Sequence, residues 1–286
     1  MHTISAFKCK DCRDKQYICK PGPNTAKAFL CKCAAVCKKC NNTGYYFMQD
    51  ELERDIAYPC ECAKNNYKIN LFNAAGIPGR FFDATFDNFE IKQSGSLKKK
   101  YEDIKFKVNN YSPSHHQSFL FMGPVGVGKT RLVCSMVHHY IFELGVPCLF
   151  QEFSNLLSEI KAGYDKGKSE SSLLEPLNNI DILVIDELGK GRKSDWEINI
   201  LDTIVSHRYN LGKTTIFTTN YTDKKETTYT ESHFSRQDNM QKETKVSATL
   251  KERIHTRIYS RLKEMCEFYD FCDLKDFRTR EVVYKI

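Results

Sequence analysis

The 286-residue sequence has no run of apolar residues approaching the ~20 that a helix needs to cross a membrane. Its first residues, 1–8, also lack the apolar stretch of a secretory signal peptide. These two absences predict a cytoplasmic protein with no membrane partner. In that reducing compartment, the thirteen cysteines, nine of which lie within residues 9–62, indicate metal binding rather than disulfide bonds.

A concentrated excess of positive charge is also missing. The net charge is +7, and residues 1–70 carry 12 Lys and Arg against 7 Asp and Glu. If eight cysteines in this segment bind two Zn²⁺ ions as thiolates, its net charge falls to about +1. Charge alone therefore supports nucleic-acid binding only weakly.

Residues 123–130 match the phosphate-loop pattern G-x-x-x-x-G-K-[ST]. An apolar run at 118–122 precedes the pattern and a helical pattern follows it, which is the strand–loop–helix context that the loop requires. In that context the backbone N–H groups bind the phosphates of a nucleotide, the lysine contacts the β- and γ-phosphates, and the threonine binds Mg²⁺. The residues expected to bind ATP are Gly123, Pro124, Val125, Gly126, Val127, Gly128, Lys129 and Thr130.

A second apolar strand, predicted at 181–185, ends in Asp186 and Glu187. We expect Asp186 to hold Mg²⁺ and belong to the ATP site, and Glu187 to act as the general base for the attacking water. A further strand at 213–219 ends at Asn220. This side chain is a candidate for positioning the water beside the γ-phosphate, with an ordinary turn residue as the alternative.

The cysteines at the N-terminus form two similar sets, offset by 28 residues. Each set has a C-x2-C pair followed by a C-x-C pair, and supplies the four soft ligands of a tetrahedral structural zinc site. Free thiols or an iron–sulfur cluster are the alternative, ligands could cross between the sets, and Cys19 is unassigned. The expected zinc ligands are Cys9, Cys12, Cys31 and Cys33 in the first set, and Cys37, Cys40, Cys60 and Cys62 in the second.

A last helix, predicted at 247–265, carries Arg253, Arg257 and Arg261 at intervals of four residues, and therefore on one face. A solvated basic face is one interpretation. The other is that Arg257 or Arg261 serves as an arginine finger, which stabilises the transition-state charge on the ATP of a neighbouring subunit.

Taken together, these motifs resemble the DnaC/IstB branch of the AAA+ ATPases, which contains bacterial and phage helicase loaders and transposition helpers. The resemblance covers residues 71–286 and rests on 123–130, 182–189, 218–220, 257–262 and 276–278. It implies an α/β fold, the AAA+ P-loop three-layer α/β/α sandwich with a five-stranded parallel sheet and no C-terminal helical lid. It also implies that Arg257, Arg261 or both act across a subunit interface.

We expect three regions: a zinc-binding region at 1–70, a linker and adenine-pocket segment at 71–117, and the ATPase domain at 118–286 with a polar loop at 221–247. The leading hypothesis is an oligomeric, ATP-hydrolysing helicase loader or remodelling factor that acts on a replicative helicase at single-stranded DNA. The alternatives are a transposition helper ATPase and a non-enzymatic adaptor switched by ATP. The expected cofactors are ATP, Mg²⁺ and Zn²⁺.

Overall fold

The computed structural model describes residues 8–34, 36–37, 39–60, 62–89, 95–114, 117–224, 227–230, 243–246, 248–274 and 276–277. Contacts divide the chain into two compact units, Met1–Glu90 with Arg131–Phe150, and Ile91–Thr130 with Gln151–Ile286. The boundaries expected at residues 70 and 117 separate regions that would fold independently of one another. Independent folding of these regions stays a prediction. Within the described residues, no helix is both long and apolar enough to span a bilayer.

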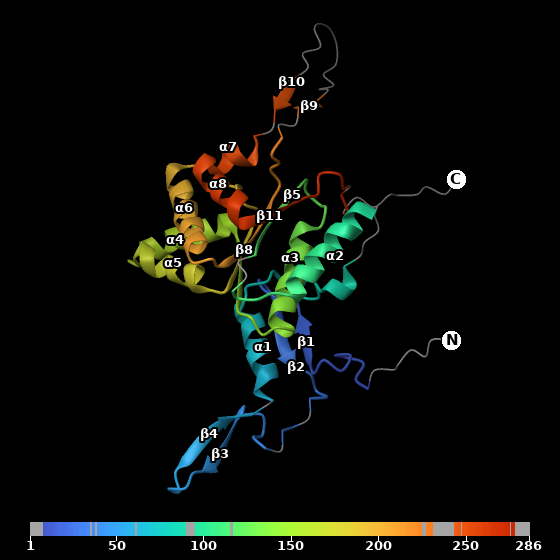
Figure 1. Ribbon diagram of the computed structural model, residues 1–286, viewed down its shortest axis with the longest axis vertical. Coiled ribbons are helices and arrows are strands. Elements are labelled where there is room, and N and C mark those ends of the chain that lie inside the picture. Colours follow the sequence, from blue (N-terminus) through green and yellow to red (C-terminus); the bar gives the residue numbers. More distant parts are fainter. Residues whose placement is uncertain are drawn as a thin grey trace, which may run out of the picture. The chain divides into compact units, whose positions relative to one another are not determined.

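The first unit holds two antiparallel hairpins, two short 3₁₀ turns and a helix, together with most of α3 (Figure 1). In the first hairpin β1 pairs with β2, and in the second β3 pairs with β4. The elements are β1 (Tyr17–Lys20), β2 (Lys27–Leu30), β3 (Tyr45–Gln49), β4 (Asp55–Pro59), α1 (Ala63–Ala74), and the turns at Gly79–Phe81 and Phe86–Asn88.

Aromatic packing joins the first hairpin to α1 and α3. The ring of Tyr17 stacks on Phe142 of α3 with centroids 3.8 Å apart, and Phe72 of α1 lies 5.2 Å from the same Phe142 ring. The side chain of Asn73 accepts a hydrogen bond from the N–H of Ala28 at 2.7 Å and donates to its carbonyl at 3.0 Å. The first hairpin is therefore part of the core of this unit.

Five strands form a parallel sheet in the order β11-β5-β8-β7-β6. Its strands are β5 (Ser118–Met122), β6 (Cys148–Glu152), β7 (Ile182–Asp186), β8 (Thr214–Thr219) and β11 (Cys266–Asp270). Every residue of β5, β7 and β8 is buried, as in parallel sheets that are covered on both faces. The expected α/β class and parallel sheet are confirmed.

The helices are α2 (Gly95–Asn109), α3 (Lys129–Phe142), α4 (Phe153–Asp165), α5 (Glu170–Asn179), α6 (Asp195–Asn210), α7 (Leu250–Ile254) and α8 (Thr256–Met265). Arg208 of α6 is fully buried and donates hydrogen bonds to carbonyls that include those of Leu177 and Thr214. The residues described after β11, 271–274 and 276–277, form no helix.

Much of the polar loop expected at 221–247 lies outside the described residues, namely 225–226, 231–242 and 247. Two short strands are described within it, β9 (Thr227–Thr230) and β10 (Glu243–Val246), and they pair in antiparallel register. The described part of this polar segment thus contains a β-hairpin, in keeping with the preference of threonine and tyrosine for strands.

Candidate nucleotide site and cysteine centres

The phosphate loop connects the end of β5 to the start of α3. Gly126 and Gly128 have φ values of 86° and 91°, a left-handed conformation that glycine adopts without steric cost. The turn brings Lys129 and Thr130 to the first positions of α3. Local sequence therefore produces the loop shape in which backbone N–H groups bind phosphate.

Lys129 lies at the centre of this site and is 7% exposed. Its ammonium group donates hydrogen bonds to the carbonyls of Gly123 and Pro124, both at 2.7 Å, and to Oδ1 of Asn220 at 2.8 Å. Because β8 is the neighbour of β5 in the sheet, Asn220, which follows β8, reaches the phosphate loop. The structure thus brings together two residues that are 91 positions apart in the sequence.

Thr130 and Asp186 form the oxygen-rich part of the site. The hydroxyl of Thr130 lies 3.1 and 3.2 Å from the two carboxylate oxygens of Asp186, and Thr218 donates to the same carboxylate at 2.5 Å. Burial raises the pKa of Asp186, nearby Glu187 and Glu152 raise it further, and the two hydroxyl hydrogen bonds oppose this shift. A hydroxyl and a carboxylate are ligands that suit Mg²⁺.

Glu187 directly follows Asp186 and has a left-handed backbone, with φ of 57°. Its N–H donates to the hydroxyl of Thr218 at 3.0 Å, which fixes the turn at the end of β7. The carboxylate of Glu187 forms an ion pair with Lys190, whose ammonium also lies 3.5 Å from Glu152. Sequence reasoning missed Thr218 and Lys190, although both lie within a few residues of predicted site residues.

The prediction of a single helix at 247–265 is wrong. His255 has φ of 68° and divides the segment into α7 and α8, so Arg253 is not on the helix that carries Arg257 and Arg261. The guanidinium of Arg253 donates two hydrogen bonds to the carbonyl of Gly189, at 2.7 and 3.0 Å. This side chain therefore links α7 to the segment that follows β7.

The two remaining arginines share Asp202 of α6 but differ in exposure. Arg261 is 2.7 Å from Asp202 and its side chain is 23% exposed. Arg257 is 3.7 Å from Asp202 and its side chain is 73% exposed. Of this pair, only Arg257 thus has a mostly exposed side chain, and a finger role for either residue stays a prediction.

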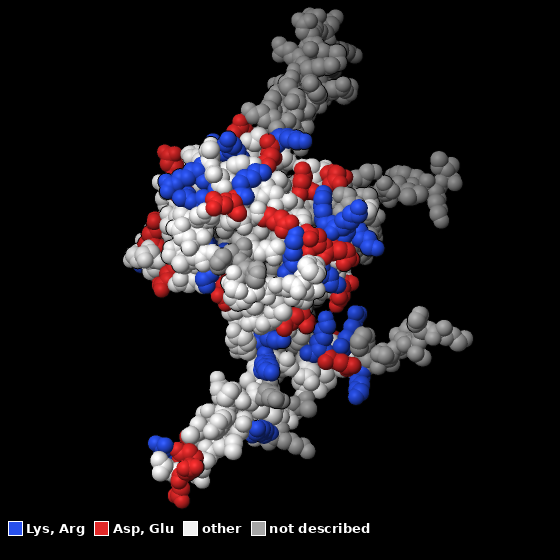
Figure 2. Space-filling model, in the orientation of Figure 1, with Lys and Arg blue, Asp and Glu red and all other residues white. Residues whose placement is uncertain are grey.

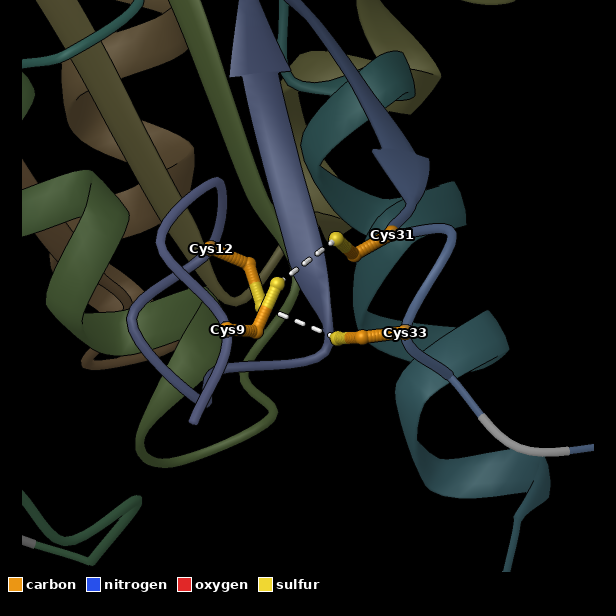
Figure 3. A group of neighbouring side chains, drawn as sticks. All are labelled: Cys9, Cys12, Cys31 and Cys33. Atoms are coloured by element: carbon orange, nitrogen blue, oxygen red, sulfur yellow. Dashed lines mark hydrogen bonds between the residues drawn. The ribbon is translucent and has the colours of Figure 1, made fainter. Parts of the chain in front are cut away.

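The first cysteine set brings four sulfurs together from the segments before β1 and after β2 (Figure 3). All four lie within 4.8 Å of one another, with Cys9 3.7 Å from Cys31 and Cys12 3.2 Å from Cys33. Tetrahedral thiolates around Zn²⁺ have sulfurs about 3.8 Å apart. The cluster therefore fits a zinc ion.

The second set has the same arrangement at the base of the β3–β4 hairpin. Cys37 lies 3.6 Å from Cys60, and Cys40 lies 3.0 Å from Cys62. The hydrogen bond from Cys62 lowers the pKa of Cys40 to about 6, while the same contact raises the pKa of Cys62 to about 12. The two contacting thiols thus have pKa values shifted in opposite directions, and metal binding requires the thiolate form.

Among the described residues, each group of four sulfurs comes from one sequence set, so the geometry favours two sites without crossing between the sets. Cys19 lies in β1 opposite Ala28 and belongs to neither group among the described residues. Burial raises its pKa to about 12.

A family model described as "IstB-like ATP binding protein" matches residues 66–236, more than half of the chain. The matched segment contains the phosphate loop, Asp186, Glu187 and Asn220, but neither Arg257 nor Arg261.

The chain is 30% identical over 152 residues to the replicative helicase loader DnaC of Buchnera aphidicola subsp. Baizongia pistaciae, a match covering 52% of this chain and 61% of the relative. It is 29% identical over 153 residues to DnaC of Escherichia coli strain K12, covering 52% and 60%. The chain thus spans about 60% of the length of these curated relatives.

Among solved structures, a crystal structure of the DnaC helicase loader aligns with a TM-score of 0.53 and 27% identity. This alignment covers 67% of this chain and 98% of that one. The structure of DnaI aligns with the same TM-score at 17% identity, covers 68% and 94%, and shows the fold alone.

Proposed function

Because the chain belongs to the family of IstB-like ATP-binding proteins, we propose that it is a cytoplasmic ATPase that hydrolyses ATP to ADP and phosphate. We further propose that it acts as a helicase loader or remodelling factor in DNA replication. One observation carries the ATPase proposal: Lys129 contacts Asn220 and the adjacent Thr130 contacts Asp186, at the carboxyl edge of the parallel sheet. Ligands bind at this edge in open α/β sheets.

In this proposal the ammonium group of Lys129 leaves the loop carbonyls and Asn220 when ATP binds. It then contacts the β- and γ-phosphates. The N–H groups of the loop and of the start of α3 bind the remaining phosphate oxygens. Thr130 and Asp186 would hold Mg²⁺, which supplies charge neutralisation on the phosphates when bound.

Glu187 would accept a proton from the attacking water, and Asn220 would orient that water. The carboxylate of Glu187 is paired with Lys190 in this structure. We therefore propose that Lys190 moves away from Glu187 in the hydrolysing state, because the ion pair occupies the carboxylate that must face the attacking water.

The proposed active state is an oligomer, in which Arg257 or Arg261 completes the ATP site of the neighbouring subunit. The greater exposure of Arg257 supports it as the residue that reaches the neighbour. Single-stranded DNA is the proposed track along which the subunits assemble, and a replicative helicase is the proposed protein partner. The similarity to proteins named replicative helicase loaders supports this choice.

The family description favours a second candidate function, because the matching model is named after IstB. In that case the protein would be an ATPase that assists a transposase. A third possibility, an adaptor switched by ATP without turnover, is disfavoured by Glu187 and Asn220, since nucleotide binding alone requires neither residue.

The test of the ATPase proposal compares nucleotide binding with hydrolysis in two variants. Lys129→Ala should lose binding of a fluorescent ATP analogue. Glu187→Gln should bind the analogue normally but hydrolyse ATP about 100-fold more slowly or worse, because it lacks the general base. Glu159→Gln, an exposed glutamate of α4, is the matched control and should behave as wild type.

Wild-type hydrolysis by Glu187→Gln would contradict the assignment of the base. An ATP-dependent gain in loading of the purified replicative helicase onto circular single-stranded DNA would support the loader function. An effect only on a transposase encoded beside the protein would favour the second candidate.

A further inference from the structure

The β3–β4 hairpin, residues 45–59, exposes apolar side chains along its whole length. Six large apolar residues within these fifteen positions are exposed: Tyr45 at 58%, Phe47 at 68%, Met48 at 55%, Leu52 at 70%, Ile56 at 39% and Tyr58 at 41%. Contiguous apolar surface of this kind is uncommon on proteins without a partner and is typical of interaction sites.

The exposed residues occupy both faces of the hairpin. The register pairs Phe47 with Ala57 and Met48 with Ile56, and successive residues of a strand point to opposite faces. Tyr45 and Phe47 therefore share one face, and Met48 and Ile56 share the other. A two-stranded hairpin exposed on both faces has no core of its own, so the second cysteine set at its base must supply its stability.

The tip of the hairpin is acidic and has hydrogen bonds of its own. Asp50 accepts hydrogen bonds from the N–H groups of Leu52 and Arg54, both at 2.9 Å, and forms an ion pair with the Arg54 guanidinium at 2.7 Å. Glu51, Glu53 and Asp55 are exposed around this turn. Figure 2 shows the acidic atoms gathered at the tip and uncharged surface along the strands.

The hairpin is thus negative on a chain that is positive overall. Residues 45–59 contain four acidic side chains and one basic one, whereas the whole chain has a net charge of +7. Four thiolates around one Zn²⁺ at the base would add two further negative charges. The four exposed aromatic and methionine side chains (Tyr45, Phe47, Met48 and Tyr58) belong to the residue types enriched at protein interfaces.

The hairpin of the first cysteine set exposes only two large apolar side chains among its described residues, Phe29 at 49% and Leu30 at 40%, and it packs against other elements. This hairpin stacks Tyr17 on Phe142 and is held to α1 through Asn73. The two sets share one sequence pattern but differ in surroundings, which indicates a structural role for the first and an interaction role for the second.

We propose that the β3–β4 hairpin is a docking element that inserts between apolar surfaces of a partner protein, with its acidic tip facing lysines and arginines at the rim. The proposal rests on the proposed function, and takes the partner to be the protein on which this ATPase acts. Nucleic acid is disfavoured although the aromatic residues could stack on bases, because phosphates and the acidic tip repel each other.

The test uses the full-length protein, the purified replicative helicase of the same genome and a fluorescent 35-nucleotide oligo-dT. The double variant Phe47→Ser with Met48→Ser removes one anchor from each face, and should weaken helicase binding by about tenfold or more. Glu51→Lys with Glu53→Lys should also weaken binding, most strongly at low salt. Both variants should keep two zinc ions per chain, wild-type ATP hydrolysis and wild-type oligo-dT binding.

Phe106→Ser, which alters a side chain 66% exposed on α2, is the matched control and should leave helicase binding unchanged. If the hairpin variants bind the helicase as wild type does, the docking proposal is wrong while the loader function stands. If the double variant loses oligo-dT binding or self-association instead, the occupant is nucleic acid or a second copy of the chain. If the wild-type protein itself fails to bind the helicase, the proposed loader function is wrong, and the docking proposal fails with it.

Discussion

The carboxylate of Asp276 lies against Gly126 of the phosphate loop, so closely that a Cβ atom built on this glycine would be 1.9 Å from Oδ1 of Asp276. The segment after β11 is held at the loop by backbone hydrogen bonds from Phe271 to Met122 at 2.8 Å and from Phe277 to Gly126 at 3.1 Å. A negative group from the far end of the sequence therefore sits beside the loop proposed to bind a polyphosphate.

We predict that Asp276→Asn binds ATP more tightly than the wild-type protein, by about three- to tenfold, because it removes a negative charge near the bound phosphates. Titration with a fluorescent ATP analogue at low salt measures the effect. Asp273→Asn, in the same segment but paired with Lys100 at 3.4 Å, is the control. Weaker binding by Asp276→Asn would instead show that the carboxylate supports the shape of the loop.

The two cysteine sets should respond differently to the loss of a ligand. Cys12→Ser should lower the thermal midpoint of the protein by about 5 °C or more, because the first set holds the hairpin whose Tyr17 stacks on Phe142. Cys40→Ser should unfold only the β3–β4 hairpin and leave ATP binding intact. Elemental analysis should find two zinc ions in the wild-type protein and one in each variant; iron, or a single metal in the wild type, would contradict the two-site prediction.

The grouping of the candidate site residues could be predicted from the sequence because the motifs are local. The phosphate loop is a continuous stretch between a strand and a helix, and Asp186 and Glu187 close a continuous apolar strand. The topology then places Asn220 beside Lys129 without any further signal, since parallel strands end at one edge of the sheet.

Features that depend on distant contacts were not predictable in the same way. Strand β11 reads Cys-Glu-Phe-Tyr-Asp, which has two acidic residues among five and no continuous apolar run, and it is a strand because it pairs with β5. The break between α7 and α8 requires a left-handed histidine at 255, and the spacing of the arginines gives no hint of it. The difference between the cysteine sets is equally invisible in their spacing, because it depends on which residues each hairpin contacts.

His138 makes the stability of the protein depend on pH. It is buried among Tyr17, Phe72 and Phe142, and this burial lowers its pKa to about 3. The unfolded chain takes up the proton near pH 6.5, so the stability is complete above that value and is lost as the pH falls toward about 3. The loss reaches at most about 5 kcal/mol, since each unit of pKa difference corresponds to about 1.4 kcal/mol.

His138→Leu should therefore lose less stability than the wild type between pH 6.5 and pH 4.5, as measured by urea unfolding. Zinc release at low pH affects both proteins alike, so the difference between them isolates the histidine. His207→Gln, at an exposed position of α6, should follow the wild-type curve. Parallel curves for the wild type and His138→Leu would contradict the prediction.

The different surroundings of Arg257 and Arg261 predict different defects. Arg261→Ala breaks a half-buried ion pair with Asp202 and should lower the stability by about 1 kcal/mol. Arg257→Ala should leave stability and ATP affinity unchanged but reduce hydrolysis about 100-fold or more, if its exposed guanidinium completes the site of a neighbour. Thermal unfolding, ATP-analogue binding and steady-state hydrolysis separate these effects.

Mixing of inactive variants decides whether Arg257 acts on a neighbour. A Lys129→Ala chain keeps Arg257, and an Arg257→Ala chain keeps its phosphate loop, so a mixed assembly contains some complete sites. Its hydrolysis should exceed the sum of the two variants measured alone, and should rise with protein concentration, because complete sites form only between chains. If the two variants are folded, co-assemble and yet show only additive rates, Arg257 does not complete a shared site. The arginine would then be a solvated basic side chain, for which the phosphates of single-stranded DNA are the natural partner.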